Sequence, residues 1–174
     1  MTSVAVPHLP EPGHNSLVSP DRFKQLFRAV PSAVSIIAIR DGATVHATTV
    51  SAFTSLSVDP PMVMLALDRR SAALALLMQR ARFALNVLSH DQADLALACA
   101  TKGPGKLPAD HWRDDGGIAL LAGAAAWAIC RTDQILEGGD HRVVLAFVEA
   151  SSVNSESPLV YQDRAFHRLH RLPS

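Results

Sequence analysis

Two short runs of β-branched and small residues lie on either side of Asp41-Gly42. The first covers residues 33–40 and the second covers residues 43–51. An Asp-Gly pair between two such runs is the strongest short-range signal for a β-hairpin, because glycine adopts the positive φ that tight hairpin turns need. The sequence therefore predicts an antiparallel hairpin over residues 33–51.

Later segments of the chain are also short, rich in aliphatic residues and typical of strands. They cover residues 62–67, 83–88, 124–135, 141–153 and 159–169. Residues 62–67 follow a loop closed by Asp59-Pro60-Pro61 and contain no polar residue, so we expect a fully buried strand there. These strands do not alternate regularly with helices. The pattern therefore predicts a mainly β fold, a β-barrel with helical insertions.

Helices are predicted in three places. The first begins at Pro20, with Ser19 as its N-cap. Its apolar residues repeat at helical spacing on one face: Phe23, Leu26, Phe27 and Val30. A second helix is expected over residues 71–80, and Ser89 with Gln92 predicts the capping box of a third.

Length and composition fit one globular domain. The chain has 174 residues, of which 48% are hydrophobic and 18% are charged. Residues 1–18 are rich in proline and lack periodicity, so we expect a disordered tail before a single domain over residues 19–174. Residues 102–117 are rich in glycine, proline and charge, and are expected to form a long loop.

Charge and motif patterns argue against several classes of function. Sixteen basic residues balance sixteen acidic ones, so the chain lacks the positive charge of a dedicated nucleic-acid binder. No apolar run is long enough to cross a bilayer and the first residues do not resemble a signal peptide, which predicts a cytoplasmic protein without a membrane partner. Cys99 and Cys130 form no CxxC pair, and no metal site is expected. Rossmann, P-loop and nucleophile-elbow motifs are missing, so any cofactor is bound in another way.

The stretch from His46 to Pro61 carries a dense group of hydroxyl residues, with six Ser and Thr residues between Thr48 and Ser57. Small side chains leave backbone N–H groups approachable, and hydroxyl groups add donors that suit a phosphate or the polar edge of a ring. Taken alone, the same pattern also fits a Ser/Thr-rich edge strand followed by a rigid turn.

Three more segments offer polar groups to a binding site. Arg69, Arg70 and Ser71 open a predicted helix and suit an anion, although a capped helix beside a charge pair explains them equally well. Asn86 lies in an apolar strand and must find a partner in the neighbouring backbone or in a ligand. His141 follows a Gly-Gly-Asp turn and is also compatible with a turn histidine bonded within the barrel.

In their order along the chain, these segments resemble the short-chain flavin reductases of the FMN-binding split-barrel class, the reductase components of two-component flavin-dependent monooxygenases. The resemblance runs from about Phe23 to Leu169. It rests on these segments: Val30–Val34, Thr49–Ser57 with Pro60-Pro61, Arg69 with Ser71, Phe83 with Asn86, Gly139–His141 and Pro158–Tyr161. The resemblance implies a split barrel of Greek-key type that forms a homodimer.

The resemblance also implies which residues bind the cofactor, FMN or FAD. One group would contact the flavin ring, largely through backbone groups: Thr49, Val50, Ser51 and Ala52. A second group would flank the ring and the ribityl chain from a turn: Ser55 and Ser57. A third group would bind the phosphate: Arg69, Arg70 and Ser71. Phe83 and Asn86 would support the ring from their strand, and His141 would lie near the nicotinamide of NADH or NADPH and orient it.

Several positions depart from the family pattern. Ala47 stands where the family often has glycine, and Ser32-Ala33 stands where it often has Thr-Gly. Ala73 stands where a second hydroxyl is common in the family. Lys106 stands where the family often has a basic residue followed by phenylalanine, but here Leu107 follows it. The loss of one hydroxyl contact would weaken flavin binding by several-fold to roughly tenfold.

The function that the resemblance implies is that of an NAD(P)H:flavin oxidoreductase. Hydride would pass from the nicotinamide to the flavin, and the reduced flavin would leave for a partner monooxygenase. The chemistry belongs to the two cofactors, so a set of binding residues is expected rather than a catalytic triad. Two alternatives stay open: a split-barrel flavoprotein that holds its flavin tightly and transfers electrons directly, and a non-enzymatic flavin-binding protein.

Overall fold

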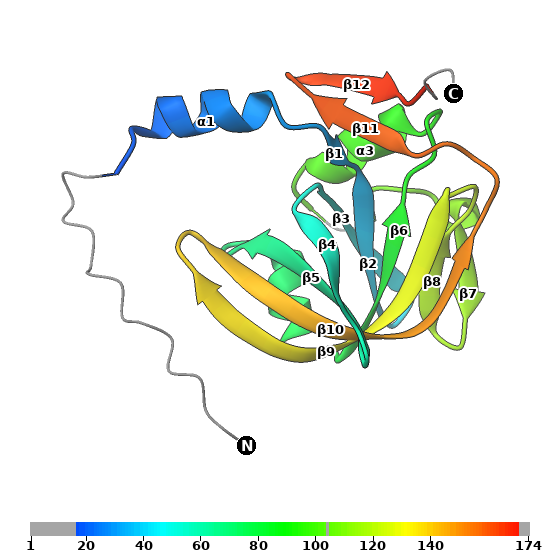
Figure 1. The fold of residues 1–174 in the computed structure, drawn as a ribbon. Coiled ribbons are helices and arrows are strands. Elements are labelled where there is room, and N and C mark those ends of the chain that lie inside the picture. The colour runs from blue at the N-terminus through cyan, green and yellow to red at the C-terminus, as the bar shows by residue number, and fades with distance from the viewer. Residues whose placement is uncertain (1–16, 104, 171–174) are drawn as a thin grey trace.

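The computed structural model describes residues 17–103 and 105–170, and these residues form mainly antiparallel strands (Figure 1). The strands are β1 (Ser32–Ala33), β2 (Ser35–Asp41), β3 (Thr44–Val50), β4 (Phe53–Val58), β5 (Pro61–Asp68), β6 (Arg82–Val87), β7 (Trp112–Asp115), β8 (Ile118–Leu121), β9 (Ala126–Gly138), β10 (His141–Val153), β11 (Leu159–Gln162) and β12 (Ala165–Arg168). The helices are α1 (Pro20–Arg28), α2 (Ala72–Leu77), α3 (Ala93–Ala100) and the 3-10 helix η2 (Ala109–His111).

Seven strands form one sheet in the order β3-β2-β6-β9-β10-β5-β4. The predicted hairpin is present, because β2 and β3 pair in antiparallel register and Gly42 between them has φ 58°. Neighbours such as β2 and β6, or β5 and β10, come from distant parts of the chain, as in Greek-key barrels. The predicted mainly β fold is therefore confirmed.

The barrel is open between the two edge strands of this sheet. Within the described residues, β3 and β4 follow each other in the chain but no ladder pairs them. Side chains from both halves of the sheet nevertheless meet in one core, since Val50 of β3 belongs to the same buried cluster as Leu65 and Phe83. The short link Ser51-Ala52 lies at the opening and is exposed.

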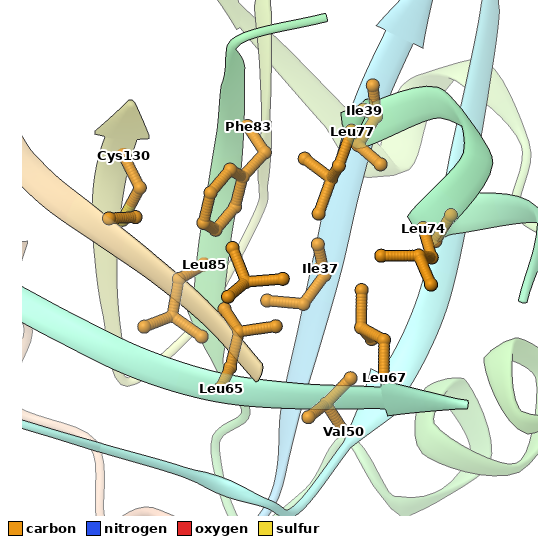
Figure 2. Packing of buried hydrophobic residues seen from close by; sticks show 13 residues of the cluster. Ile37, Ile39, Val50, Leu65, Leu67, Leu74, Leu77, Phe83, Leu85 and Cys130 are labelled. Carbon is orange, nitrogen blue, oxygen red and sulfur yellow. The ribbon is translucent and has the colours of Figure 1, made fainter. Parts of the chain in front are cut away.

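The core of the barrel is aliphatic around one aromatic ring. Figure 2 shows Phe83, Leu85 and Ile37 pointing into the space between the strands. Helix α2 covers this core with Leu74 and Leu77, which belong to the same cluster. The packing of α2 brings the link between β5 and α2 close to β3, and this is where the candidate site lies.

Helix α1 starts as predicted, since the Ser19 hydroxyl accepts a hydrogen bond from the backbone N–H of Arg22 at 3.4 Å. In Figure 1 the helix stands away from the barrel, and none of its residues is buried. Phe23 is 54% exposed, Leu26 is 61% exposed and Phe27 is 54% exposed. The apolar face of α1 therefore has no core to pack against within the described chain.

Two expectations about the region around Pro60 are wrong. Residues 53–58, expected to belong to a loop and a turn, form the edge strand β4 and pair with β5. Strand β5 is not fully buried, because only Leu65 and Leu67 are buried and the other residues of the strand are partly or fully exposed. One face of β5 packs on the core and the other borders the candidate site.

The third helix starts later than the expected capping box. Ser89 and Gln92 do interact, as the Gln92 Oε1 accepts a hydrogen bond from the Ser89 backbone N–H at 3.1 Å. The Ser89 hydroxyl, however, bonds to Asp91. This arrangement forms a turn before the helix, and α3 begins at Ala93.

Two later segments also differ from expectation. Residues 102–117 contain η2 and β7, and β7 pairs with β8, so the segment is not only a loop. Residues 159–169 form the hairpin β11–β12 rather than one strand, because Asp163 (φ 46°) and Arg164 (φ 65°) make its two-residue turn.

Residues 1–16 of the expected tail lie outside the described part of the chain. No helix in that part is both long and apolar enough to span a membrane.

Candidate cofactor-binding site

Two adjoining pockets lie where β3, β5 and α2 meet. The first has a volume of about 270 Å³ and is lined by residues 48–52 with His141; we call it the His141 pocket. The second has a volume of about 370 Å³ and is lined by residues 46–48 with Lys102 and Lys106; we call it the lysine pocket. Three residues line both pockets, which therefore adjoin each other: Thr48, Asp68 and Ser71.

The wall of the His141 pocket is formed by the end of β3 and the link to β4, residues 48–52. The Thr49 hydroxyl donates to the Ala96 carbonyl at 2.6 Å, so it ties β3 to α3. The pairing of β3 with β2 ends at Val50, and the next two residues, Ser51 and Ala52, are exposed. The wall therefore presents mainly small side chains and backbone.

His141 is the first residue of β10 and lies opposite Asp68 of β5 in the strand register. Its Nδ1 lies 2.8 Å from the Asp140 Oδ1. This hydrogen bond is the main cause that lowers the pKa of the Asp140 carboxyl group. A carboxylate on Nδ1 favours the tautomer with the proton on that nitrogen, which leaves Nε2 available to a ligand.

The link between β5 and α2 brings a hydroxyl group to the boundary of the two pockets. The Asp68 carboxylate accepts hydrogen bonds from the Arg70 backbone N–H at 2.7 Å and from its guanidinium at 3.2 and 3.1 Å. The side-chain bond from Arg70 is the main cause that lowers the pKa of Asp68 to about 2. Ser71 occupies the N-cap position of α2, but its hydroxyl does not cap the helix. It remains available to a ligand in either pocket.

The lysine pocket contains Lys106, which stands where the family often has a basic residue but was not among the expected site residues. The Lys106 Nζ donates hydrogen bonds to the Ala47 carbonyl at 2.9 Å and to the Cys99 carbonyl at 2.8 Å. Burial lowers the pKa of Lys106. His46 and Lys102 add further basic groups to the same pocket. Its partner on β3 could not be found from the sequence, because Ala47 is 59 positions away.

The structure does not bring every expected site residue to these pockets. Arg69 turns away, since its guanidinium donates to the Gly139 carbonyl at 3.3 Å and lies 3.8 Å from Glu137. Ser55 and Ser57 lie on β4 and line neither pocket. In the described single chain they are therefore separated from the other site residues.

Phe83 and Asn86 are fully buried and expose no atom to a ligand. The Asn86 amide donates to the Ile36 carbonyl at 3.1 Å and accepts from the Leu121 backbone N–H at 2.9 Å. Of the two partners considered for Asn86, neighbouring backbone or a ligand, the structure shows neighbouring backbone. Both residues support the site only through the strands that they hold in place.

The donor set of the two pockets fits a flavin nucleotide. A shallow wall of backbone and hydroxyl groups suits the polar edge of an aromatic ring. Lysine and serine side chains in the adjoining pocket suit a phosphate group.

Comparison with known proteins agrees with this geometry. A family model described as "Flavin reductase like domain" matches residues 27–170. The chain belongs to this family. The resemblance noted from the sequence is therefore confirmed, and the mainly β barrel is the fold shared with solved flavin reductases.

Three related proteins illustrate the similarity. The reductase component of 4-nitrophenol 4-monooxygenase/4-nitrocatechol 2-monooxygenase of Rhodococcus opacus is 35% identical, over 80% of this chain and 75% of that protein. The reductase component of 4-hydroxyphenylacetate 3-monooxygenase of Thermus thermophilus is 31% identical, over 86% of this chain and 96% of that protein. The structure of an NADH:FAD oxidoreductase of Streptomyces globisporus superposes with a TM-score of 0.83 at 25% identity, over 91% of this chain and 99% of that one.

Proposed function

We propose that this protein is an NAD(P)H:flavin oxidoreductase that supplies reduced FMN or FAD to a partner monooxygenase. The observation that carries the proposal is the pair of adjoining pockets, one walled by backbone and hydroxyl groups with His141 and the other lined by lysines. Membership of the flavin reductase family and relatives named as NADH-dependent reductases support the same activity.

In this proposal each pocket takes one part of the flavin. The end of β3 and the link Ser51-Ala52 hold the ring edge in the His141 pocket, and Ser71 with Arg70 lies beside the phosphate. When bound, the flavin supplies the ring that accepts a hydride from the reduced nicotinamide. The protein orients the two reactants and keeps them in contact.

His141 orients the nicotinamide in this proposal. Its Nδ1 is held by Asp140, so Nε2 is the ring nitrogen that a carboxamide can reach. We expect His141→Asn to raise the KM for NADH by several-fold to roughly tenfold, the effect of one hydrogen bond, and to leave the KM for flavin unchanged. Steady-state kinetics in which each substrate is varied separately measure both values. An equal rise of both KM values would show that His141 supports the fold of the pocket instead.

The proposed assembly is a homodimer. The exposed apolar face of α1 needs a partner, and exposed apolar residues also occur on β4, where Leu56 is 46% exposed and Val58 is 90% exposed. A groove of about 540 Å³ between α1 and the β11–β12 hairpin is lined by Ser51 and Ala52 as well. A second copy seated against α1 would thus lie next to the His141 pocket.

The activity is tested by measuring the consumption of NADH and NADPH in air, with and without added FMN or FAD. We expect turnover that rises and saturates with added flavin, because the open wall at Ser51-Ala52 lets the flavin exchange. A protein that stays yellow after dialysis, and whose turnover ignores added flavin, would favour the tightly bound flavoprotein. Flavin binding without any turnover would favour a non-enzymatic binding protein.

A further inference from the structure

A third pocket lies between the β2–β3 hairpin and the segment that precedes β7. It has a volume of about 330 Å³ and is lined by Trp112; we call it the Trp112 pocket. The hairpin contributes Arg40 and residues 43–45 to its wall, and the segment after α3 contributes Gly105 and Leu107. None of these residues lines the His141 pocket or the lysine pocket, so the Trp112 pocket is a separate cavity.

The Trp112 pocket follows the lysine pocket along β3. Residues 46–48 line the lysine pocket and residues 43–45 line the Trp112 pocket. Because a strand rises by about 3.3 Å per residue, these two stretches are centred about 10 Å apart. Lys106 lines the lysine pocket, whereas its neighbours Gly105 and Leu107 line the Trp112 pocket. A ligand that crosses the chain at Lys106 can therefore occupy both pockets.

The free edge of β3 offers backbone groups to the Trp112 pocket. Strand β3 is an edge strand, and the Ala47 carbonyl points away from β2, since it accepts a hydrogen bond from Lys106 at 2.9 Å. In an antiparallel pair, the backbone groups of residues two apart point to the same side, so the N–H and C=O of Val45 also point to the free edge. A neighbouring N–H and C=O match the acceptor and donor on the polar edge of an adenine ring.

Trp112 offers a face on which a planar ring can stack. It is partly buried and packs against two clusters of the core, which fix its position. Among the described residues no aromatic ring or cation is stacked on Trp112, whereas the guanidinium of Arg113 lies 5.5 Å from the ring centre of Trp127. Stacking on an aromatic side chain is the usual way in which proteins bind an unpaired base.

The charges at the Trp112 pocket favour a neutral ring over a phosphate. Arg40 is the charged residue in the described wall, and its Nε lies 3.2 Å from the Asp114 Oδ1, so its charge is balanced. The same buried Nε makes no hydrogen bond within the described chain. A guanidinium carries five N–H donors, so Arg40 can still donate to an uncharged acceptor such as a ring nitrogen.

We propose that the Trp112 pocket binds an adenine ring, and that the adenine of FAD is its source. The inference rests on the proposed flavin reductase function, which places the flavin phosphate beside Ser71, a residue that lines the lysine pocket. The second phosphate and the ribose of FAD then cross the chain at Lys106, and the adenine stacks on Trp112 with its polar edge towards Val45. FMN ends at its phosphate and does not reach this pocket. A free adenine nucleotide carries the same ring and is the alternative source.

The experiment compares the dissociation constants of FAD and FMN, measured by isothermal titration calorimetry. For the unaltered protein we expect FAD to bind about tenfold more tightly than FMN, the effect of stacking one base on an aromatic side chain. Trp112→Leu keeps an apolar side chain for the core and removes the ring face. Thr44→Trp fills the same pocket from an exposed position. Each variant should lose most of the FAD preference and bind FMN nearly as before.

Two matched controls test whether the effect belongs to this pocket. Trp127→Leu removes the other tryptophan, which packs against the same core cluster but lines none of the three pockets. Ser155→Trp adds an indole at an exposed position that also lines none of them. Both should keep the FAD preference, and circular dichroism checks that every variant is folded. Equal weakening of FAD and FMN in Trp112→Leu and Thr44→Trp would overturn the inference, since it would mean that both changes disturb the lysine pocket.

AMP, titrated into the protein with FMN already bound, separates the two sources of the ring. If FAD and FMN bind equally well but AMP binds and loses its affinity in Trp112→Leu, the pocket takes adenine from a free nucleotide rather than from FAD. If FAD and FMN bind equally well and AMP does not bind, or if the FAD preference survives in both pocket variants, the inference is wrong and the flavin reductase function stands. If neither FAD nor FMN binds, the proposed function itself fails.

Discussion

Replacing Ser51 with tryptophan is expected to abolish measurable flavin binding, with a rise of the dissociation constant of more than about a hundredfold, and to leave the fold intact. Ser51 is exposed on the link between β3 and β4 and lines the His141 pocket of about 270 Å³. An indole group there takes up space that the flavin ring needs. Such a steric block removes the whole ring contact, and a loss of about 2.7 kcal/mol already corresponds to a hundredfold change.

Fluorescence titration with FMN measures the affinity, and thermal unfolding checks the fold. Ser155→Trp is a matched control, because Ser155 is exposed in the loop after β10 and lines neither pocket. It should bind FMN like the unaltered protein. A folded Ser51→Trp variant with unchanged FMN affinity would contradict the placement of the ring at this wall.

Replacing Phe27 with glutamate is expected to convert the proposed homodimer into a monomer. Phe27 lies on the apolar face of α1 and is 54% exposed in the single chain. Burying such a side chain against a second copy contributes about 1.5–3 kcal/mol, and a buried unpaired carboxylate opposes association further. We expect the dimer dissociation constant to rise by about a hundredfold or more, as measured by sedimentation equilibrium.

The fold of each chain should survive this change, because no residue of α1 is buried in the described structure. Gln25→Glu supplies the control, since it adds the same charge on the opposite, polar face of the helix. That variant should remain dimeric. If the unaltered protein is monomeric at micromolar concentration, the proposed homodimer is wrong. If the Phe27→Glu variant stays dimeric, a surface other than α1 joins the subunits.

Local patterns accounted for much of the barrel. The hairpin around Asp41-Gly42 follows from turn chemistry that acts within a few residues, and strand β10 covers the predicted residues, His141–Val153. The exposed link at Ser51-Ala52 was also expected to offer backbone to a ligand. Burial was harder to predict: β5 looks fully apolar, yet one of its faces borders the site. Residue type alone does not say which side of a strand meets the core.

The long-range partners of the site residues could not be derived from local pattern. Arg69 and Arg70 are adjacent, yet the backbone N–H of Arg69 bonds to the Asp140 carbonyl of the neighbouring hairpin at 3.1 Å, and its side chain turns towards Glu137. Arg70 folds back on Asp68 instead. Two neighbouring arginines therefore have different surroundings, because the register of β5 with β10 ends at Asp68, beyond which Arg69 still bonds to the hairpin and Arg70 bonds back to Asp68.

Spacing, turn residues and apolar runs were sufficient to indicate a mainly β barrel, because they act over a few positions. The flavin reductase class followed from the resemblance of several ordered segments to that family. The roles of Asn86 and Lys106 depended on the assembled fold. Asn86 is satisfied by backbone groups 50 and 35 positions away, and Lys106 reaches a carbonyl 59 positions away. Such partners meet only after the barrel has closed and α3 has packed on β3. Whether a polar side chain faces a ligand or another strand was therefore settled by packing.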